Sequence, residues 1–461
     1  MKLGIETMGK YKKNKPYLTI FSILIFCSFL SGCSILIDSI NLLKETDAST
    51  MLAENITETT ISVTPISLKD TQTSESLQQT PSPENASIPD IQNLVIWVPP
   101  QFDPSQNTKE SKILTDLIGK FTEEHPGVNI TFRVKAITGD GSALSALSAA
   151  KNAAPDVIPS LVILNRNDLL SAVQKGLVYP ITTNIFSEAN SWYSYAKQSS
   201  AAENYIYGIP IAGDTLVMVY RASKTGAAMT TWEDILSRGL PIAFVPASSD
   251  GLFPTFIYLA KGGKLIDDKG QPWLDQSILV DTLKLFLTGG QNGAFPPSLA
   301  QVVDQSQNWQ MFLEGSVSII ISNFSTFQHN KGPDIKAMAI PLFTDNQRYP
   351  LMNTWNIAVT TSNAEIQNLG IQFAEKMADP IFNDIWTANA GFFPVRQSEH
   401  VEWQKDESYD TILKILPDAA LLPESQILNK ISPILNMAVS KVIKSQTTPE
   451  QAAQEAISEL E

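Results

Sequence analysis

Apolar positions recur along the chain with two periods that separate strands from helices. A continuous apolar run at 94–98 is typical of a strand buried on both faces, and the alternating run at 128–134 predicts another strand. Apolar residues three and four apart within 109–125 predict an amphipathic helix, which Pro126 and Gly127 end. The same patterns predict strands at 156–164, 242–247, 317–322 and 335–342, and helices at 142–153, 167–175, 363–377 and 380–390 and from 231 and 448.

Strand and helix signals alternate from about residue 90 onward, which indicates an α/β fold with a mostly parallel sheet. The preceding stretch, 34–89, contains no aromatic residue and no glycine. It has eight acidic residues and two lysines. Such a segment cannot bury enough apolar surface to fold. We therefore expect 34–89 to be a disordered tether rich in Ser and Thr.

The N-terminus has the parts of a secretory signal. Four lysines between 10 and 15 precede the apolar run 17–30, and Cys33 follows Leu30, Ser31 and Gly32. This ending resembles the bacterial lipobox. The resemblance implies a lipoprotein signal peptide at 1–33 and a lipidated Cys33, which would anchor the chain to the cell membrane on its extracytoplasmic face. The charge-free stretch 16–37 is also long enough for an uncleaved transmembrane helix, and on either interpretation the bulk of the chain lies outside the cytoplasm.

Composition removes several classes of function. The formal net charge of −14 argues against nucleic-acid binding, which needs a basic surface. Of the two cysteines, Cys27 would be removed with the signal peptide and Cys33 would carry the lipid. We therefore expect no disulfide, no metal site and no cofactor. The chain has no G-x-S-x-G, Walker, G-x-G-x-x-G or H-E-x-x-H motif, so we predict that it is not an enzyme. An unrecognised cell-surface hydrolase remains an alternative.

A series of segments resembles, in order, the extracellular solute-binding proteins of ABC importers, a family that includes sugar binders. In this sequence they read LVIWV (94–98), ILTDLIGKFTEEHPGVNITFRV (113–134), AAPDVIPSLVIL (153–164), LLSAVQKGLVYPI (169–181), YGIPIAGDTLVMVYR (207–221), TTWEDIL (230–236), MFLEGSVSIIIS (311–322) and FFPVR (392–396). Two segments depart from the family pattern. LMNTWNIAV lacks the Gly-Gly or Gly-Trp pair that the family often has before the strand containing Trp355, and Asn323-Phe324-Ser325 stands where Gly-Pro-Trp is usual.

The resemblance implies a two-lobed periplasmic-binding-protein fold of type II, with discontinuous lobes joined by crossing strands. The crossings are expected near 211–216, 351–357 and 393–396. The expected lobes are 90–212 with 357–395, and 213–356 with 396–461.

The resemblance also implies a monomeric receptor that captures a small polar solute, a sugar or oligosaccharide, between two closing lobes. The receptor would deliver this solute to the permease subunits of an ABC transporter. A pair of lobes that reports to a signalling partner is the alternative.

Candidate ligand-binding residues follow predicted strands or lie in the crossings. A sugar cleft uses aromatic faces and planar polar groups. The candidates of these types are Gln101, Asn165, Arg166, Asp214, Asn323, Phe324, Trp355, Phe392 and Phe393. Structural roles compete with this interpretation, since Asp214 could cap a turn with Gly213, Trp355 could pack into the core or hinge, and Arg166 could pair with a surface acid.

Overall fold

The structure, a computed structural model, describes residues 92–188, 191–226, 229–246, 251–344 and 347–460. The predicted signal peptide, Cys33 and the tether lie outside the described residues. None of the helices within the described ranges is long and apolar enough to cross a bilayer.

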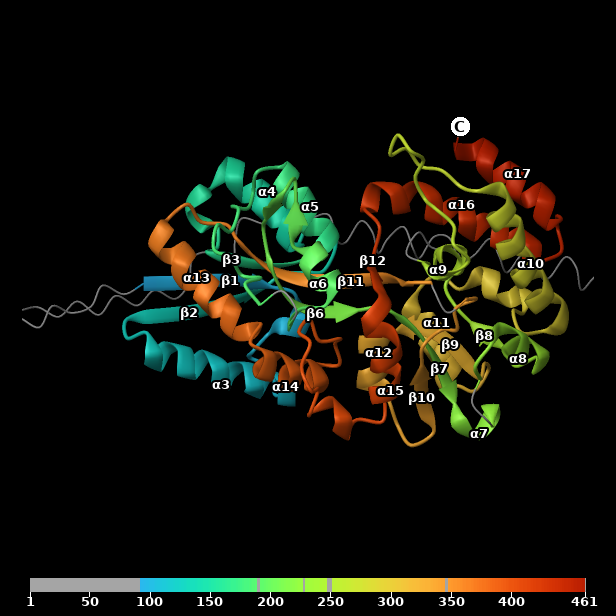
Figure 1. The fold of residues 1–461 in the computed structure, drawn as a ribbon, viewed down its shortest axis with the longest axis horizontal. Helices are drawn as coiled ribbons and strands as arrows, with labels where there is room; N and C mark the ends of the chain where they lie inside the picture. Colours follow the sequence, from blue (N-terminus) through green and yellow to red (C-terminus); the bar gives the residue numbers. More distant parts are fainter. Residues whose placement is uncertain (1–91, 189–190, 227–228, 247–250, 345–346, 461) are drawn as a thin grey trace, which may run out of the picture. The chain divides into compact units, whose positions relative to one another are not determined.

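The first of two large sheets has the strand order β12-β11-β3-β1-β2, and β6 also pairs with β11 (Figure 1). Its strands are β1 (Gln92–Val98), β2 (Val128–Val134), β3 (Leu161–Asn165), β6 (Ile209–Asp214), β11 (Tyr349–Val359) and β12 (Ala419–Leu421). Strand β1 is parallel to both β2 and β3, as expected. Strand β11 is parallel to β12 but antiparallel to β3 and β6, so the sheet is mixed, with three parallel and two antiparallel pairings.

The second sheet has the order β10-β7-β9-β8. Its strands are β7 (Leu216–Arg221), β8 (Ile242–Ala243), β9 (Ile319–Asn323) and β10 (Ile335–Met338), and a small hairpin joins β4 (Ala201–Ala202) to β5 (Tyr205–Ile206). Here β8 and β9 are parallel, whereas β7 runs antiparallel to both β9 and β10. Strand β7 follows β6 after Thr215 alone and runs antiparallel to both of its neighbours, which alternation of strand and helix did not predict.

Helices surround both sheets. Their bounds are α3 (Lys109–Glu124), α4 (Ala143–Ala153), α5 (Arg166–Gln174), α6 (Ser194–Ser199), α7 (Ala222–Thr225), α8 (Trp232–Ser237), α9 (Phe253–Ala260), α10 (Gln276–Asn292), α11 (Gln305–Leu313), α12 (Phe324–Asn330), α13 (Ala364–Met377), α14 (Pro380–Ala390), α15 (Tyr409–Ile415), α16 (Ser425–Ile443) and α17 (Pro449–Leu460). The predicted helix at 380–390 is confirmed. The predicted strand at 156–164 is shorter than expected, since 155–157 forms a 3-10 helix and Pro155 and Pro159 have no backbone N–H to donate.

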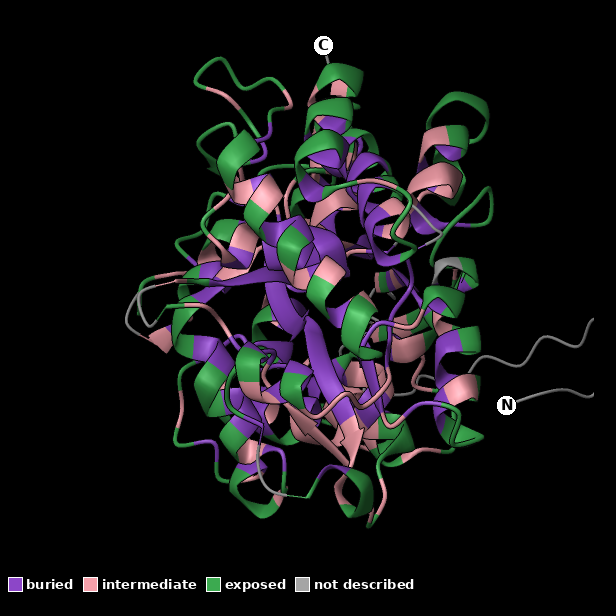
Figure 2. Ribbon diagram, turned by 90° about the vertical axis from the view of Figure 1, so that its right-hand side faces the viewer, coloured by how far each residue is buried: buried purple, intermediate pink, exposed green. Residues whose placement is uncertain are grey.

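Strand β1 shows how the first sheet is covered on both faces. Leu94, Ile96 and Val98 point into one core with Phe121 of α3, whereas Trp97 belongs to a second cluster with residues of α4 and α5. Alternate side chains of a strand point to opposite faces, so helices pack on each side of β1. Figure 2 shows the strands as a buried band within a more exposed layer of helices.

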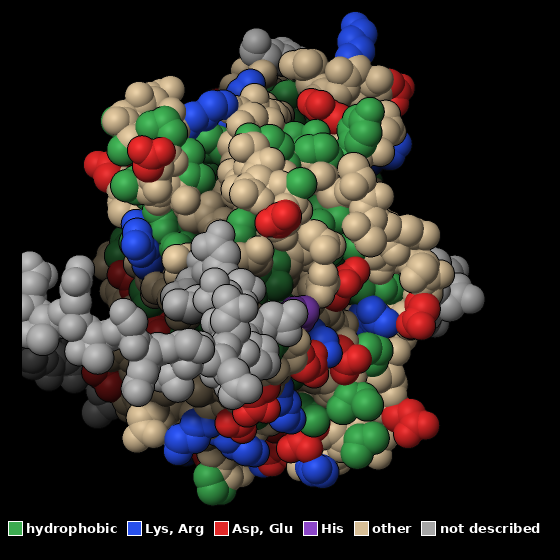
Figure 3. Space-filling model, turned by 90° about the vertical axis from the view of Figure 1, so that its left-hand side faces the viewer, with side chains coloured by type: hydrophobic (Ala, Val, Ile, Leu, Met, Phe, Trp, Pro, Cys, Tyr) green, Lys and Arg blue, Asp and Glu red, His purple; other side chains and the backbone are tan. Residues whose placement is uncertain are grey.

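Charged side chains of both signs lie interspersed on the face drawn in Figure 3. One ion pair of the chain joins Lys376 of α13 and Glu124 of α3, with 2.9 Å between the charged atoms. Both side chains are about half exposed, so solvent and salt screen the pair and it contributes little to stability. This mixture differs from the single-sign basic stripe that binds a phosphate backbone.

The two sheets meet where the chain was expected to cross. Strand β6 ends at Asp214 and β7 begins at Leu216, so Thr215 alone separates them. The Tyr349 hydroxyl of β11 donates to the Leu216 carbonyl at 2.7 Å. Gly213 and Phe393 exchange two backbone hydrogen bonds of 2.9 and 2.7 Å. The three predicted crossings therefore lie together at the junction of the sheets.

Candidate functional site

A pocket of about 490 Å³, called here the junction pocket, lies where the two sheets meet. Residues from both sheets and from α12 line it, namely Gln101, Ile137, Asp214, Asn323, Ser325, Thr326, His329, Asn330, Asn353, Trp355 and Phe392. Gln101 and Ile137 follow the parallel strands β1 and β2. In open α/β sheets a ligand binds beyond the carboxyl ends of such strands, so the position of this pocket is that of a ligand site.

Five of the nine predicted contact residues line the junction pocket. They are Gln101, Asp214, Asn323, Trp355 and Phe392. They come from five different segments of the sequence and meet only because the crossings converge. Their contact with a ligand stays a prediction.

Asp214 closes the junction pocket beside the start of α12. Its carboxylate accepts a hydrogen bond from the backbone N–H of Ser325 at 3.1 Å and one from the Ser325 hydroxyl at 2.6 Å. Asp214 thus caps α12 from a different strand, whereas the alternative considered from the sequence was a turn cap with Gly213. Each carboxylate oxygen has a second lone pair, so these two bonds leave acceptor capacity for a ligand hydroxyl.

Burial raises the pKa of the Asp214 carboxyl to about 6, although hydrogen bonds from Ser325 and neighbouring backbone N–H groups lower it. The native state therefore binds a proton that the unfolded chain releases between the usual pKa of 3.8 and about 6. The stability that this proton contributes is complete below the unfolded pKa and is lost as the pH rises through the folded pKa.

We therefore predict that wild type loses about 2 kcal/mol of unfolding free energy relative to Asp214→Asn between about pH 4 and pH 7. The asparagine variant keeps the size of the side chain but cannot ionise, so it is the matched reference. Urea unfolding of both proteins across this range measures the difference. A difference that stays constant with pH would contradict the assignment.

Trp355 and Phe392 form an aromatic floor of the junction pocket, and Phe102 packs against both. The Phe102 ring stacks on Trp386 at 5.2 Å and on Phe392 at 5.8 Å between centroids, and it meets the Trp355 ring edge-on at 5.7 Å. Trp355 is 8 % exposed and Phe392 is 4 % exposed, so each presents a small part of its surface to the pocket. Trp355 and Phe392 therefore pack into the core with most of their surface and face the pocket with the remainder.

The other four predicted residues lie outside the junction pocket. The Asn165 side chain caps α5 by accepting from the Asp168 N–H at 2.9 Å. Arg166 donates to the carbonyls of Gln198 and Ser199 at 3.4 Å. Phe324 and Phe393 are fully buried, with ring centroids 4.6 Å apart. These four side chains are held by the protein itself, and burial lowers the pKa of Arg166 while the Glu424 charge raises it.

Sequence reasoning missed the contribution of α12. Ser325, Thr326, His329 and Asn330 line the junction pocket from one side of this short helix. Positions i, i+1, i+4 and i+5 share a face at 3.6 residues per turn, so this polar spacing was the available signal.

The chain is similar to known proteins in both family and fold. The family model described as bacterial extracellular solute-binding protein matches residues 116–411. Comparison with curated protein sequences finds no significant match. Among solved structures, the chain is similar to the GacH receptor of Streptomyces glaucescens, at 16% identity and a TM-score of 0.61, over 79% of this chain and 96% of that one.

Two further structures share the fold. A maltodextrin-binding protein from L. casei has 14% identity and a TM-score of 0.64, over 80% of this chain and 98% of that one. An ABC substrate-binding protein from Listeria monocytogenes, in complex with cycloalternan, has 14% identity and a TM-score of 0.61, over 80% and 97%. At these identities the likeness establishes a two-lobed periplasmic-binding-protein fold. The family model covers more than half of the sequence, and the chain therefore belongs to the bacterial extracellular solute-binding protein family.

Proposed function

We propose that this protein is a receptor that captures a carbohydrate in the junction pocket and delivers it to the permease subunits of an ABC transporter. One observation carries the proposal. The pocket combines hydroxyl, amide and carboxylate groups with an aromatic floor, at the place where two lobes are joined. Hydroxyl-rich rings need planar polar partners at their edges and an apolar surface against one face.

The ligands of the similar structures support a carbohydrate. The GacH receptor is described in complex with acarbose, another similar protein with maltotetraose, and the Listeria protein with cycloalternan. We propose no catalytic role for this chain and no bound cofactor. We also propose that it acts as a monomer, because the recognition event lies between its own lobes.

The proposed lobes are 90–212 with 357–395, and 213–356 with 396–461. All four strands of the second sheet fall within 213–356, and α16 and α17 pack against α10 in the same lobe. Strand β12 lies at the boundary, since it pairs with β11 of the first sheet. Closure of the lobes would bury the carbohydrate, and the permease would then distinguish the liganded form from the empty one.

A thermal-shift screen of the full-length chain in mild detergent tests the proposal. Neutral oligosaccharides, polyols, amino acids and polyamines would be compared at equal concentration. Because a ligand that binds only the native state stabilises it by RT ln(1 + [L]/Kd), we expect a shift for at least one oligosaccharide and none for the amino acids or polyamines. A shift with an amino acid alone would contradict the proposal.

We further propose that lipid on Cys33 anchors the receptor outside the cytoplasm. The wild-type chain is expected to partition into the detergent phase of a Triton X-114 separation, and Cys33→Ala into the aqueous phase once its signal has been cleaved. The physical reason is that each buried methylene of the lipid contributes about 0.8 kcal/mol to membrane binding. Cleaved Cys33→Ala protein that still enters the detergent phase would exclude this anchor.

A further inference from the structure

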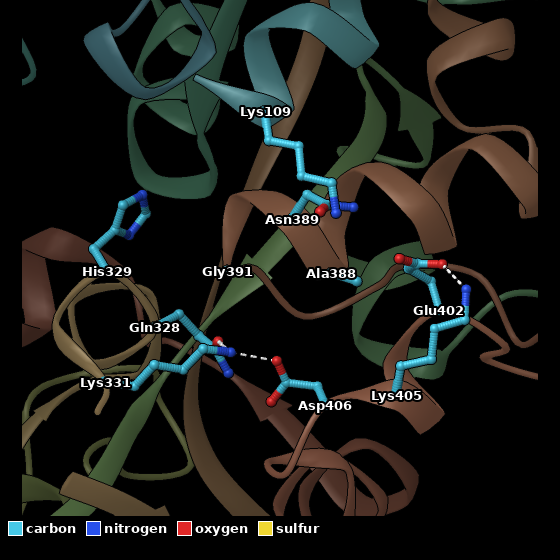
Figure 4. Close-up of a pocket in the computed structure, with 10 residues that line it drawn as sticks. All are labelled: Lys109, Gln328, His329, Lys331, Ala388, Asn389, Gly391, Glu402, Lys405 and Asp406. Atoms are coloured by element: carbon cyan, nitrogen blue, oxygen red, sulfur yellow. Dashed lines mark hydrogen bonds and ion pairs between the residues drawn. The ribbon is translucent and has the colours of Figure 1, made fainter. Parts of the chain in front are cut away.

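A second pocket of about 380 Å³ adjoins the junction pocket and shares His329 with it. We call it the lysine pocket. Its lining residues are Lys109, Gln328, His329, Lys331, Ala388, Asn389, Gly391, Glu402, Lys405 and Asp406 (Figure 4). They come from α3 and α14 on one side and from the α12 end on the other, so this pocket also lies between elements of both lobes.

The charges of the lysine pocket do not cancel. Lys331 pairs with Asp406 and donates to the Gln328 amide oxygen at 2.7 Å. Lys405 pairs with Glu402 at 2.5 Å. The two acids of the pocket are thus neutralised, and Lys109 adds one positive charge in a chain whose net charge is −14.

Lys109 is an exposed residue of the lysine pocket. Within the part of the chain that the structure describes, no hydrogen bond or ion pair joins its ammonium group to another residue. Its side chain extends into the pocket toward Asn389 (Figure 4). Lys109 is also the first residue of α3, where the helix dipole disfavours a cation. An anion in the pocket would relieve this repulsion.

His329 connects the two pockets and has one free ring nitrogen. Its Nδ1 lies 2.7 Å from the Ser325 carbonyl oxygen, and a carbonyl only accepts, so Nδ1 carries the hydrogen. The other nitrogen, Nε2, accepts from a ligand hydroxyl when the ring is neutral. When the ring is protonated, Nε2 donates to an anionic oxygen.

We propose that the ligand is an oligosaccharide with an anionic group, whose neutral ring lies in the junction pocket and whose anionic group lies between Lys109 and His329 in the lysine pocket. The inference rests on the proposed function and specifies its substrate class. A uronate carboxylate and a phosphate monoester share the required chemistry, which is a charged oxygen group at the edge of a sugar ring. Charge-assisted hydrogen bonds to such groups are about twice as strong as neutral ones.

Titration calorimetry with two matched pairs of probes tests this inference on the full-length chain. One pair is trigalacturonate and its methyl ester, in which neutral ester groups replace the carboxylates. The other is maltotriose and maltotriose 6-phosphate. We expect the anionic member of at least one pair to bind at least about tenfold more tightly at low salt, and this preference to shrink in about 1 M NaCl because salt screens the charges. The pair that shows the preference distinguishes carboxylate from phosphate.

Variants of two lysines on the same helix locate the effect. Lys109→Gln should abolish the preference within the pair, whereas Lys120→Gln, an exposed change about 16 Å further along α3, should leave it intact. Equal affinities within both pairs, failure of both anionic probes to bind, or a preference that survives Lys109→Gln would overturn the inference. Binding of a neutral probe in these cases would leave the proposed function standing, whereas a chain that binds no carbohydrate at all would refute both.

Discussion

Replacement of Trp355 with alanine is expected to weaken carbohydrate binding by at least about thirtyfold, since truncation of a central aromatic contact typically costs about 2 kcal/mol or more. Trp355 lies in β11 at the junction of the sheets and supports the Phe102 ring at 5.7 Å. The same change should lower the unfolding free energy by about 3–5 kcal/mol because the side chain is almost fully buried. Calorimetric titration and urea unfolding measure the two effects separately.

Trp232 provides the matched control for Trp355. It is 5 % exposed, stacks on Phe343 and lies in α8, away from the junction pocket. Trp232→Ala should therefore destabilise the fold to a similar extent while the affinity stays within about twofold of wild type, at a temperature where both proteins are folded. If both variants lose the same affinity, Trp355 acts through stability and does not contact the ligand.

Gly391→Ala is expected to destabilise the protein by about 2 kcal/mol more than Gly293→Ala. Both glycines end a helix with positive φ, at +76° and +88°, so both variants incur the left-handed strain of about 1–2 kcal/mol. At Gly391 the added Cβ would also lie 2.6 Å from the Gln328 Cβ, whereas at Gly293 it meets nothing within 4 Å. Overpacking of this kind adds about 1–3 kcal/mol.

The Gly391 change should also weaken ligand binding, because Gln328 belongs to α12 and this helix supplies four residues of the junction pocket. Gly293→Ala lies in α10 and should leave affinity unaltered. Denaturant unfolding and calorimetric titration of the two variants provide the comparison. Equal destabilisation by the two substitutions would show that α14 and α12 can separate without strain.

The periodicity of the sequence predicted the elements that frame the site. Strand β2 alternates strictly and helix α14 is bounded by Asp379 and Gly391, so local chemistry alone defines them. The antiparallel pairing of β11 with β3 and β6 was not predictable in this way, because it depends on a strand that returns from far along the chain.

Asn165 and Asn323 show why candidate site residues were harder to select. Each is the last residue of a buried strand and directly precedes a helix, so sequence position alone does not distinguish them. Asn165 uses its side chain to cap its own helix. The Asn323 side chain makes no such cap, because Asp214 of β6 accepts the hydrogen bond at the start of α12. The Asn323 side chain is instead exposed to the junction pocket. The difference arises from a contact between residues more than one hundred positions apart.

The aromatic floor illustrates the same limit. Phe102 follows Gln101 directly, yet its stacking on Trp386 joins the first turn after β1 to a helix near the end of the fold. Nothing in the spacing of either residue indicates the other. By contrast, the polar face of α12 repeats at helical spacing, and this pattern was present in the sequence before the structure placed it at the pocket.

A crystal structure of the chain with the oligosaccharide that gives the largest thermal shift would test the central claim most directly. The account predicts that a sugar ring lies in the junction pocket against Trp355, with its hydroxyls within hydrogen-bond distance of Asp214 and Asn353. A sugar bound elsewhere, for example beside the exposed Trp273 in the pocket near Asp267, would contradict it.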